Sequence, residues 1–178
     1  MLKKKDDPDY VIPMRPPYGE RADQYTKLTD EDWVYLEAMP PFIRIGGNWV
    51  AVHAGVEPGI PLEEQKESVL THMRYVKKDT MKMEKKLEEL TSENSIFWTN
   101  VWDGAENVIY GHHVSPGPHI SISEKGRLCV GIDTGCCFGR SLTAMVLTED
   151  GKEFSFISVP ARKQYDDYSR YSAALKVS

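Results

Sequence analysis

Residues 127–144, RLCVGIDTGCCFGRSLTA, form the stretch of sequence that says most about the fold. The run RLCVGI has the alternation typical of a strand, and a glycine-rich turn follows it directly. Asp133 and Gly135 open this turn, and Cys136 and Cys137 stand side by side within it. A second strand, beginning SLTA, comes next, so the stretch predicts two strands joined by a loop that holds a carboxylate and two thiols.

The adjacent cysteines are not expected to carry out chemistry themselves. A zinc site would need paired ligands at a spacing such as C-x2-C, and the three cysteines of the sequence contain no such pair. A disulfide between neighbouring residues would be strained. The odd number of cysteines, and the lack of an apolar signal region in MLKKKDDPDY, predict a reducing, cytoplasmic location.

Length and charge restrict the class of protein. The 178 residues suit one domain with a sizeable core. A formal net charge of −5 gives no reason to expect electrostatic binding to nucleic acid or to an anionic membrane, and no apolar run is long enough to span a bilayer. We therefore expect neither a membrane nor a nucleic acid as a general partner.

The first third of the chain is predicted to contain an extended segment, a short helix and a β-hairpin, in that order. Residues 1–28 combine prolines, glycines and alternating charge without a period, which predicts an extended polar segment. Thr29 and Asp32 then form a capping-box pattern that opens a short amphipathic helix, and the proline pair after Met39 stops it. The run FIRIGGNWVAVHAG, residues 42–55, predicts a β-hairpin around a glycine turn.

The middle and the end of the chain differ in their expected structure. Apolar residues at helical spacing predict a helix within residues 61–76, and the lysines and glutamates of 77–94 predict a charged helical insertion on the surface. Hairpins are predicted at 119–133 and at 141–159, the second with a type I′ turn at Asp150-Gly151. Residues 163–178 are expected to form a polar surface tail. Few helices followed by many short strands favour an α/β fold of which this chain supplies a β-rich part.

Two histidines share a setting that indicates a functional site. His53 ends the strand-like run VAV, and His112 ends NVIYG, and each leads into small residues or a loop. Residues at strand ends are where α/β folds present ligands to a site. Arg74 lies between them in the sequence, and its planar guanidinium can hold phosphate oxygens in a bidentate way. Together the three residues suggest a metal-phosphate site.

The motifs VHAGV, MRYV, VIYGHH and GIDTGCCFGRSLTA, in this order, resemble the C-terminal half of the calcineurin-like metallophosphoesterases. The similarity is greatest to the diadenosine tetraphosphatase branch of the phosphoprotein-phosphatase superfamily, and it covers residues 29–162. It implies a metallophosphoesterase-type β-sandwich flanked by helices, represented here by its β-rich C-terminal half. It also implies a hydrolase of the serine/threonine phosphatase superfamily.

The resemblance assigns roles to individual residues. His53 and His112 would be ligands to one ion of a site for two divalent metals (Mn, Co, Zn, Fe or Mg), and Arg74 would bind the phosphate. Asp133 would either orient a ligand histidine or cap the turn, with the turn role preferred, and Gly135 would let the backbone come close to the site. The resemblance makes Cys136 and Cys137 small buried hydrophobic residues. His113 receives no role, and His72 and His119 are interpreted as surface or hairpin residues.

The family's first three motifs, GDxHG, GDxxDRG and GNH(D/E), are absent from the 178 residues. In the family they supply the carboxylate and asparagine ligands, a further phosphate-binding arginine and the acid histidine. Two neutral imidazoles cannot balance two divalent ions. We therefore expect an inactive fragment with only a partial metal site. The alternatives are a catalytically dead interaction module (a pseudophosphatase) and a structural zinc-binding protein.

The substrate is left open among phosphorylated compounds. Dinucleoside polyphosphates, phosphoproteins, polyphosphate and the capped end of an RNA are all hydrolysed by relatives that share this metal core, so core motifs do not choose between them. A missing first half would expose a sheet edge and an apolar face, which predicts self-association.

Overall fold

The computed structural model describes residues 27–84 and 89–168, and the chain divides into two compact units, residues 1–40 and 41–178. The predicted segment 1–28 therefore lies almost entirely outside the described residues, and so does the predicted tail from residue 169 onward. Among the described residues, none of the helices combines the length and apolar character that a membrane crossing requires.

In the first unit the described element is helix α2 (Asp30–Glu37). Its first turn has the predicted capping box: the backbone N–H of Asp32 donates to the Thr29 hydroxyl over 3.2 Å, and the backbone N–H of Thr29 donates to the Asp32 carboxylate over 2.8 Å. The bonds satisfy donors that a helix start otherwise leaves unpaired. The bonds that the Asp32 carboxylate accepts from the Thr29 N–H and hydroxyl lower the pKa of Asp32. The predicted short helix is confirmed.

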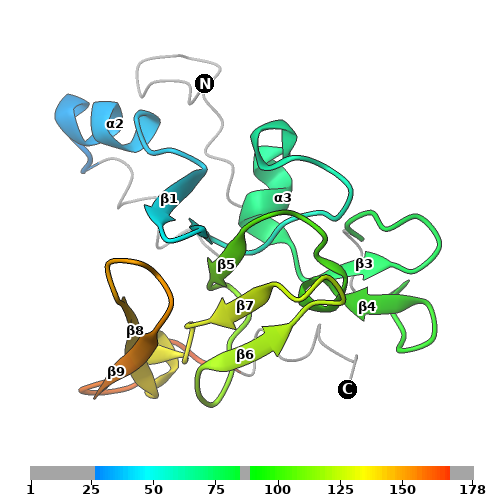
Figure 1. Ribbon diagram of the computed structural model, residues 1–178. Helices are drawn as coiled ribbons and strands as arrows, with labels where there is room; N and C mark the ends of the chain where they lie inside the picture. Colours follow the sequence, from blue (N-terminus) through cyan, green and yellow to red (C-terminus); the bar gives the residue numbers. More distant parts are fainter. Residues whose placement is uncertain (1–26, 85–88, 169–178) are drawn as a thin grey trace. The chain divides into compact units, whose positions relative to one another are not determined.

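The second unit is built on a mixed five-stranded sheet (Figure 1). The three central strands run parallel to one another, and an antiparallel strand pairs at each edge. The hairpins predicted at 42–55 and 119–133 are confirmed, and they form the two edges of the sheet. In spatial order the strands are β1 (Phe42–Gly46), β2 (Trp49–Val52), β5 (Asn107–Tyr110), β7 (Leu128–Gly131) and β6 (His119–Ile122).

One face of the sheet carries the larger core. Because successive residues of a strand point to opposite faces, Val50 and Val52 of β2 lie on the same side as Val108 of β5. They pack with α3 (Glu67–His72), α4 (Trp98–Val101) and the connecting segments. The buried side chains that complete this core are Ala54, Val56, Leu62, Val69, Leu70, Met73, Val76, Trp98, Trp102, Tyr110 and Cys129.

The opposite face is covered by the hairpin β8 (Ser141–Leu147) and β9 (Phe154–Pro160), which confirms the predicted hairpin at 141–159. Trp49, Ile109 and Val130 of the sheet are buried there. Their partners from the hairpin are Met145, Leu147, Phe154 and Phe156. The result is a mixed α/β fold, rich in strands and poor in helices, in which a sheet is covered by a hairpin on one side and by helices on the other.

The turn of the β8–β9 hairpin differs from the prediction. A type I′ turn needs positive φ at both central residues, and here Gly151 has φ +68° whereas Asp150 does not have positive φ. The N–H of Gly151 donates to the carbonyl of Thr148 over 2.9 Å, which gives a longer loop. The type I′ prediction is therefore wrong. The loop meets the β1–β2 turn, since a Cβ built on Gly47 would lie 2.4 Å from the Cα of Gly151.

The predicted charged helix at 77–94 is wrong for the part of it that the structure describes. Strand β3 (Tyr75–Lys77) pairs with β4 (Ser95–Phe97), and Val76 also forms a bridge with Met83. Val76 is fully buried, so packing outweighs the helical charge spacing that the lysines and glutamates provide. Residues 85–88 of the predicted insertion lie outside the described residues.

The helix predicted within 61–76 is shorter than its pattern suggests. A 3-10 turn spans Leu62–Glu64, and α3 covers Glu67–His72. The helix stops where Met73, which is fully buried, takes a backbone conformation outside the helical region (ψ 134°). This early stop leads the chain directly into Arg74 and β3.

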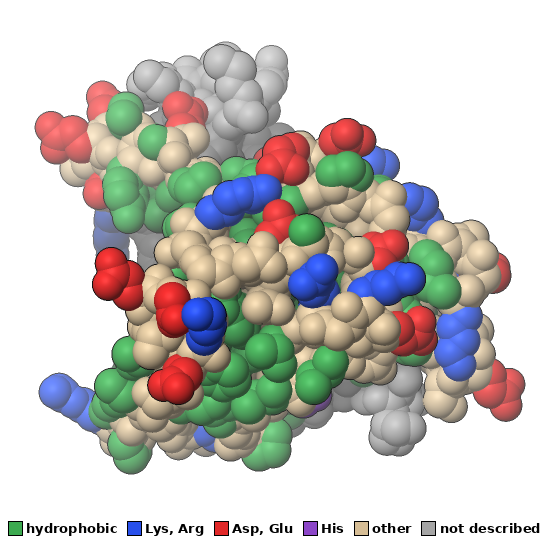
Figure 2. All heavy atoms as spheres, viewed as in Figure 1, with side chains coloured by type: hydrophobic (Ala, Val, Ile, Leu, Met, Phe, Trp, Pro, Cys, Tyr) green, Lys and Arg blue, Asp and Glu red, His purple; other side chains and the backbone are tan. Residues whose placement is uncertain are grey.

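Apolar side chains remain exposed on the outer face of β8–β9. Leu142 is 64% exposed and Val159, its direct partner across the hairpin, is 58% exposed. Val146 and Ile157 of the same hairpin are also exposed. Figure 2 shows hydrophobic side chains gathered in its lower part, where Figure 1 places β8 and β9.

Candidate functional site

His53 and His112 lie at the same edge of the central sheet. His53 follows β2 and His112 comes two residues after the end of β5, and these strands are adjacent and parallel, so their carboxyl ends meet. The ring centroids are 5.1 Å apart and the planes are tilted by 56°. The N–H of Gly111 donates to the His53 carbonyl over 2.9 Å and links the two strand ends. The two histidines that the sequence suggested are therefore brought together.

The backbone at His112 is held in an unusual conformation. His112 has φ +62°, in the left-handed region that costs most residues free energy. The preceding residue, Gly111, lies close to His53, since a Cβ built on it would make a tight contact of 3.3 Å with the His53 carbonyl oxygen. Strain of this kind concentrates at functional sites, where the surrounding structure fixes a side chain in one orientation.

Arg74 reaches the same place from the end of α3. Its guanidinium donates to the His112 carbonyl over 3.2 Å, while its own carbonyl accepts from the Trp98 N–H over 3.2 Å. Arg74 is more than half buried, and burial lowers its pKa, while Tyr168, Tyr75 and Asp133 act in the opposite direction. Among residues 27–84 and 89–168 this carbonyl is the hydrogen-bond partner of the Arg74 side chain, and a guanidinium has further donors that can bind an anion.

The electrostatics of the site favour neutral imidazoles. Burial, then the charge of Arg74, lowers the pKa of His112 to about 3. Burial also lowers the pKa of His53, against an opposing effect of Asp133. Neutral imidazole is the form that binds a metal ion, so both rings are in the competent state at neutral pH.

Asp133 follows β7, the next parallel strand of the sheet. Its carboxylate accepts from the N–H of Gly135 over 3.1 Å, and its carbonyl accepts from the N–H of Ser115 over 3.0 Å. Gly135 has φ +74°, which a glycine adopts without strain. Asp133 thus holds the turn together and also acts electrostatically on His53.

The paired cysteines are corrected in part. All three cysteines are free, and Cys129 of β7 is buried. Cys136 and Cys137 lie in a 3-10 turn, Cys136–Phe138, where Cys136 is half-buried and Cys137 is exposed. The expectation that both are small buried residues is therefore wrong for Cys137, whose carbonyl instead accepts from the N–H groups of Tyr165 and Asp166.

Two residues near the site were not expected there. The ring of His72 lies 6.1 Å from that of His112, although the sequence placed it only on the surface. The Thr71 hydroxyl donates to the Glu67 carbonyl and also shares a hydrogen bond of 2.8 Å with Nδ1 of His72, which holds that ring in place. Tyr168 lies close enough to affect the pKa of Arg74. The sequence signal for His72 was its position two residues before Arg74, whereas nothing local indicated Tyr168.

The two remaining histidines pack against aromatic rings. His113 lies 4.7 Å from the ring of Phe97, and burial lowers its pKa. His119 shares a hydrogen bond of 2.7 Å with the Tyr110 hydroxyl. His119 thus belongs to the β6–β7 hairpin, as expected, and its Nδ1 is already engaged.

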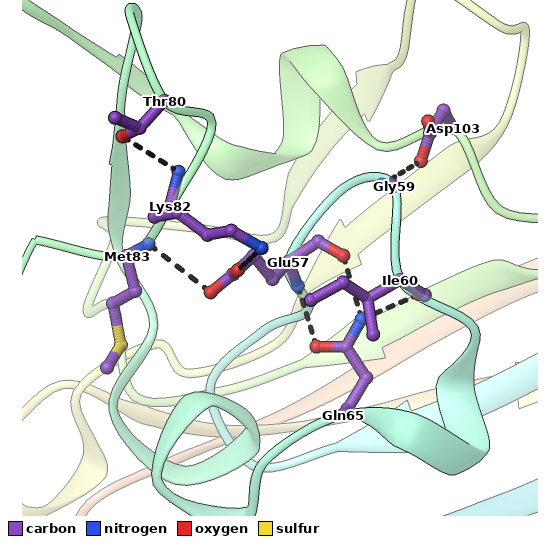
Figure 3. Close-up of polar contacts among 8 residues, drawn as sticks. All are labelled: Glu57, Gly59, Ile60, Gln65, Thr80, Lys82, Met83 and Asp103. Atoms are coloured by element: carbon purple, nitrogen blue, oxygen red, sulfur yellow. Dashed lines mark hydrogen bonds and ion pairs between the residues drawn. The ribbon is translucent and has the colours of Figure 1, made fainter.

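The loop after His53 is fixed by a buried carboxylate (Figure 3). Glu57 lies 2.7 Å from the Lys82 ammonium and accepts a 3.4 Å bond from the N–H of Met83. The Gln65 side chain accepts from the N–H of Glu57 and donates to its carbonyl, at 3.0 and 2.7 Å. These contacts connect the histidine-bearing loop to the segment after β3.

The described residues do not form a complete metal centre. Within 27–84 and 89–168, no three or more His, Cys, Asp or Glu side chains are grouped so as to hold a metal ion. Two imidazoles can contribute ligands, but a divalent ion with oxygen preference needs carboxylates as well. A metal would therefore need donors in addition to His53 and His112.

The mixed α/β fold, with its sheet between a hairpin and helices, is consistent with that of a phosphoesterase. A solved structure described as "a putative diadenosine tetraphosphatase" is similar to this chain, with 27% sequence identity and a TM-score of 0.63. The similarity covers 80% of this chain and 60% of that one, so the chain spans less than two thirds of the length of its neighbour. No family model matches the sequence, and no curated protein shows significant similarity to it.

Proposed function

We propose that this protein takes part in phosphoester hydrolysis as a metallophosphoesterase-type hydrolase, and that the 178 residues alone have little or no activity. The observation that carries the proposal is the convergence of His53, His112 and Arg74 at the carboxyl ends of adjacent parallel strands. The similarity to a structure described as a diadenosine tetraphosphatase supports the same class of reaction.

Each residue has a role that its chemistry fits. Arg74 would hold a phosphate through the donors not used by the His112 carbonyl. The neutral rings of His53 and His112 would supply nitrogen ligands to a divalent ion, completed by donors beyond the described residues. Such ions, when bound, polarise phosphoryl oxygens and activate water. The substrates that fit this class are dinucleoside polyphosphates and phosphoproteins.

A catalytically inactive interaction module is the second candidate. It is favoured by the absence of a three-ligand metal cluster among the described residues and of the three carboxylate-bearing motifs from the sequence. The exposed apolar face of β8–β9 would then be its contact surface.

Paramagnetic broadening by Mn²⁺ separates these candidates without requiring activity. Side-chain NMR signals of the five histidines would be followed while MnCl₂ is added to the 178-residue protein. We expect the signals of His53 and His112 to broaden first. His119 serves as an internal control, because its Nδ1 is bonded to Tyr110.

The matched variants are His53→Gln and His112→Gln, each of which should remove the selective broadening of the remaining partner. Equal broadening of all histidines, or none at millimolar Mn²⁺, would contradict the metal-ligand roles and favour the interaction module.

A further inference from the structure

A second arginine lies close to the site and has no role in the proposed function. Arg140 follows the 3-10 turn after Gly135, and its backbone is fixed at both ends: its N–H donates to the Gly135 carbonyl over 3.1 Å, and its carbonyl accepts from Ala161 over 2.7 Å. The segment 161–168, which we call the C-terminal strap, then runs along this turn. The N–H groups of Tyr165 and Asp166 both donate to the Cys137 carbonyl, over 2.8 and 2.9 Å.

The strap ends with a tyrosine that supports the guanidinium. The Tyr168 ring is 5.0 Å from that of Phe138 in an edge-on arrangement, and the Arg140 guanidinium carbon lies 5.3 Å from the Tyr168 ring centre. A cation over an aromatic face is attracted to it, and the contact restricts an otherwise mobile side chain. Arg140 is therefore exposed yet held in place.

The side chain of Arg140 runs toward the histidine loop. A Cβ built on Gly135 would lie 3.1 Å from Cδ of Arg140 and 2.9 Å from Cγ1 of Val114. Val114 comes two residues after His112, so the stem of Arg140 crosses the turn beside that loop. Tyr168 also raises the pKa of Arg74 electrostatically, so the tyrosine that contacts Arg140 acts on Arg74 as well.

Within residues 27–84 and 89–168, no ion pair joins Arg74 or Arg140 to a carboxylate. Asp133, the acidic residue of the turn, accepts a bond from the N–H of Gly135 and acts electrostatically on Arg74. Two arginines that form no ion pair in the described part of the chain, beside the same loop, offer donors for an anion with more than one charged group.

We propose that Arg140 is a second phosphate-binding residue, and that Arg74 and Arg140 hold different phosphates of one linear pyrophosphate chain. The site would then prefer an oligophosphate to a single phosphate group. The inference rests on the proposed function for the role of Arg74. It adds that Arg140, supported by Tyr168, selects for the length of the phosphate chain.

Calorimetric titration of the 178-residue protein with tripolyphosphate and with orthophosphate, in buffer without divalent ions, tests this role. Arg140→Gln is expected to weaken tripolyphosphate binding roughly tenfold, about the effect of one charge-assisted contact, and to leave orthophosphate binding unchanged. Arg140→Lys, which keeps the cation over Tyr168, should recover part of the loss. Arg74→Gln should weaken binding of both ions.

Lys125→Gln is the matched control, since it removes one positive charge from the β6–β7 turn, at the opposite end of β7 from Asp133. Equal losses in Lys125→Gln and Arg140→Gln would indicate general charge attraction and overturn the proposal. Wild-type affinity in Arg140→Gln, with binding lost in Arg74→Gln, would overturn the role of Arg140 and leave the proposed function standing. No tripolyphosphate binding by the wild-type protein would count against both.

Discussion

At the scale of single residues, the site depends on histidines whose rings the fold keeps uncharged, and one of them, His112, has a strained backbone. His112 combines a left-handed backbone with a pKa of about 3, caused first by burial and then by Arg74. The left-handed backbone costs folding free energy at any pH. The lowered pKa costs folding free energy in acid, because the unfolded chain binds the proton more easily than the folded one. The strain and the pKa therefore have consequences for stability that can be measured.

Acid should destabilise this protein through His112. Above pH 6.5 the residue is neutral in both the folded and the unfolded chain; between pH 6.5 and about 3 only the unfolded chain binds the proton, so the free energy of unfolding falls as the pH is lowered. Urea unfolding at pH 7 and at pH 5 measures this. His112→Asn, which carries no titrating ring and tolerates positive φ, should show a smaller difference between the two pH values. An unchanged difference would contradict the assignment.

The sequence predicted some of these residues and missed others for a physical reason. His53 and His112 were found because strand-end positions can be recognised locally, and parallel pairing of β2 and β5 brings such ends together. Arg74 was found from its guanidinium chemistry and its place between them in the sequence. Tyr168 could not be found, because its position depends on hydrogen bonds between the strap and the Cys137 carbonyl, far away in sequence. The exposure of Cys137 likewise follows from the geometry of the turn and not from residue type.

At the scale of elements, local pattern and packing compete. The segment after Arg74 has lysines and glutamates at helical spacing, yet it begins as strand β3 because Val76 is buried and pairs with Ile96 of β4. Charge spacing contributes only a few tenths of a kcal/mol per pair, whereas burial of a valine contributes about 1.5 kcal/mol or more. Strands with strong alternation, such as β6 to β9, were predicted correctly because pattern and packing agree there.

The loop after His53 depends on the contact between Glu57 and Lys82. Lys82→Ala should lower the free energy of unfolding by roughly 1–3 kcal/mol, because it leaves the buried Glu57 carboxylate with a single weak N–H partner. Lys152→Ala is the control: Lys152 pairs with Asp150 on an exposed turn, where solvent screens the charges, so this substitution should change the free energy of unfolding very little. Chemical denaturation of both variants gives the comparison; equal losses would mean that the Glu57 contact has no special importance.

At the scale of the whole second unit, the sheet and the hairpin that covers it are joined where two glycine turns meet. Besides the close approach of Gly47 to Gly151, the indole N–H of Trp49 donates to the Gly151 carbonyl over 2.9 Å. The outer face of the same hairpin is left apolar and exposed. Added side-chain volume at the contact between the turns should lower the stability of the protein. Added charge on the outer face of the hairpin should reduce self-association.

Gly47→Ala should destabilise the protein more than Gly126→Ala. Both glycines have positive φ, but a Cβ on Gly126 would meet nothing within 4 Å, whereas one on Gly47 would strike the backbone of Gly151. The conformational cost of about 1–2 kcal/mol is therefore common to both, and the clash adds roughly 1–3 kcal/mol for Gly47 only. Thermal melting compares the variants, and similar melting temperatures would contradict the close contact between the turns.

The outer face of β8–β9 is expected to cause self-association. Sedimentation velocity should show an average mass that rises with protein concentration, because contiguous exposed apolar surface favours association. Leu142→Lys with Val159→Glu, at directly paired positions, should keep the protein monomeric. Val34→Lys, at an exposed position of α2, is the control and should leave the association unchanged. A wild-type protein that stays monomeric at high concentration would contradict this expectation.

The central claim, that His53, His112 and Arg74 belong to a phosphoesterase site, is tested most directly by supplying the donors that the sequence lacks. A chimera would join a segment carrying GDxHG, GDxxDRG and GNH(D/E) to residues 29–168, and its Mn²⁺-dependent hydrolysis of diadenosine tetraphosphate and of bis(p-nitrophenyl) phosphate would be measured. We predict that the chimera hydrolyses these compounds. Arg74→Gln should reduce the rate at least about 100-fold, and His53→Gln or His112→Gln should abolish it. A folded chimera that hydrolyses neither compound, or whose rate does not depend on these three residues, would contradict the account.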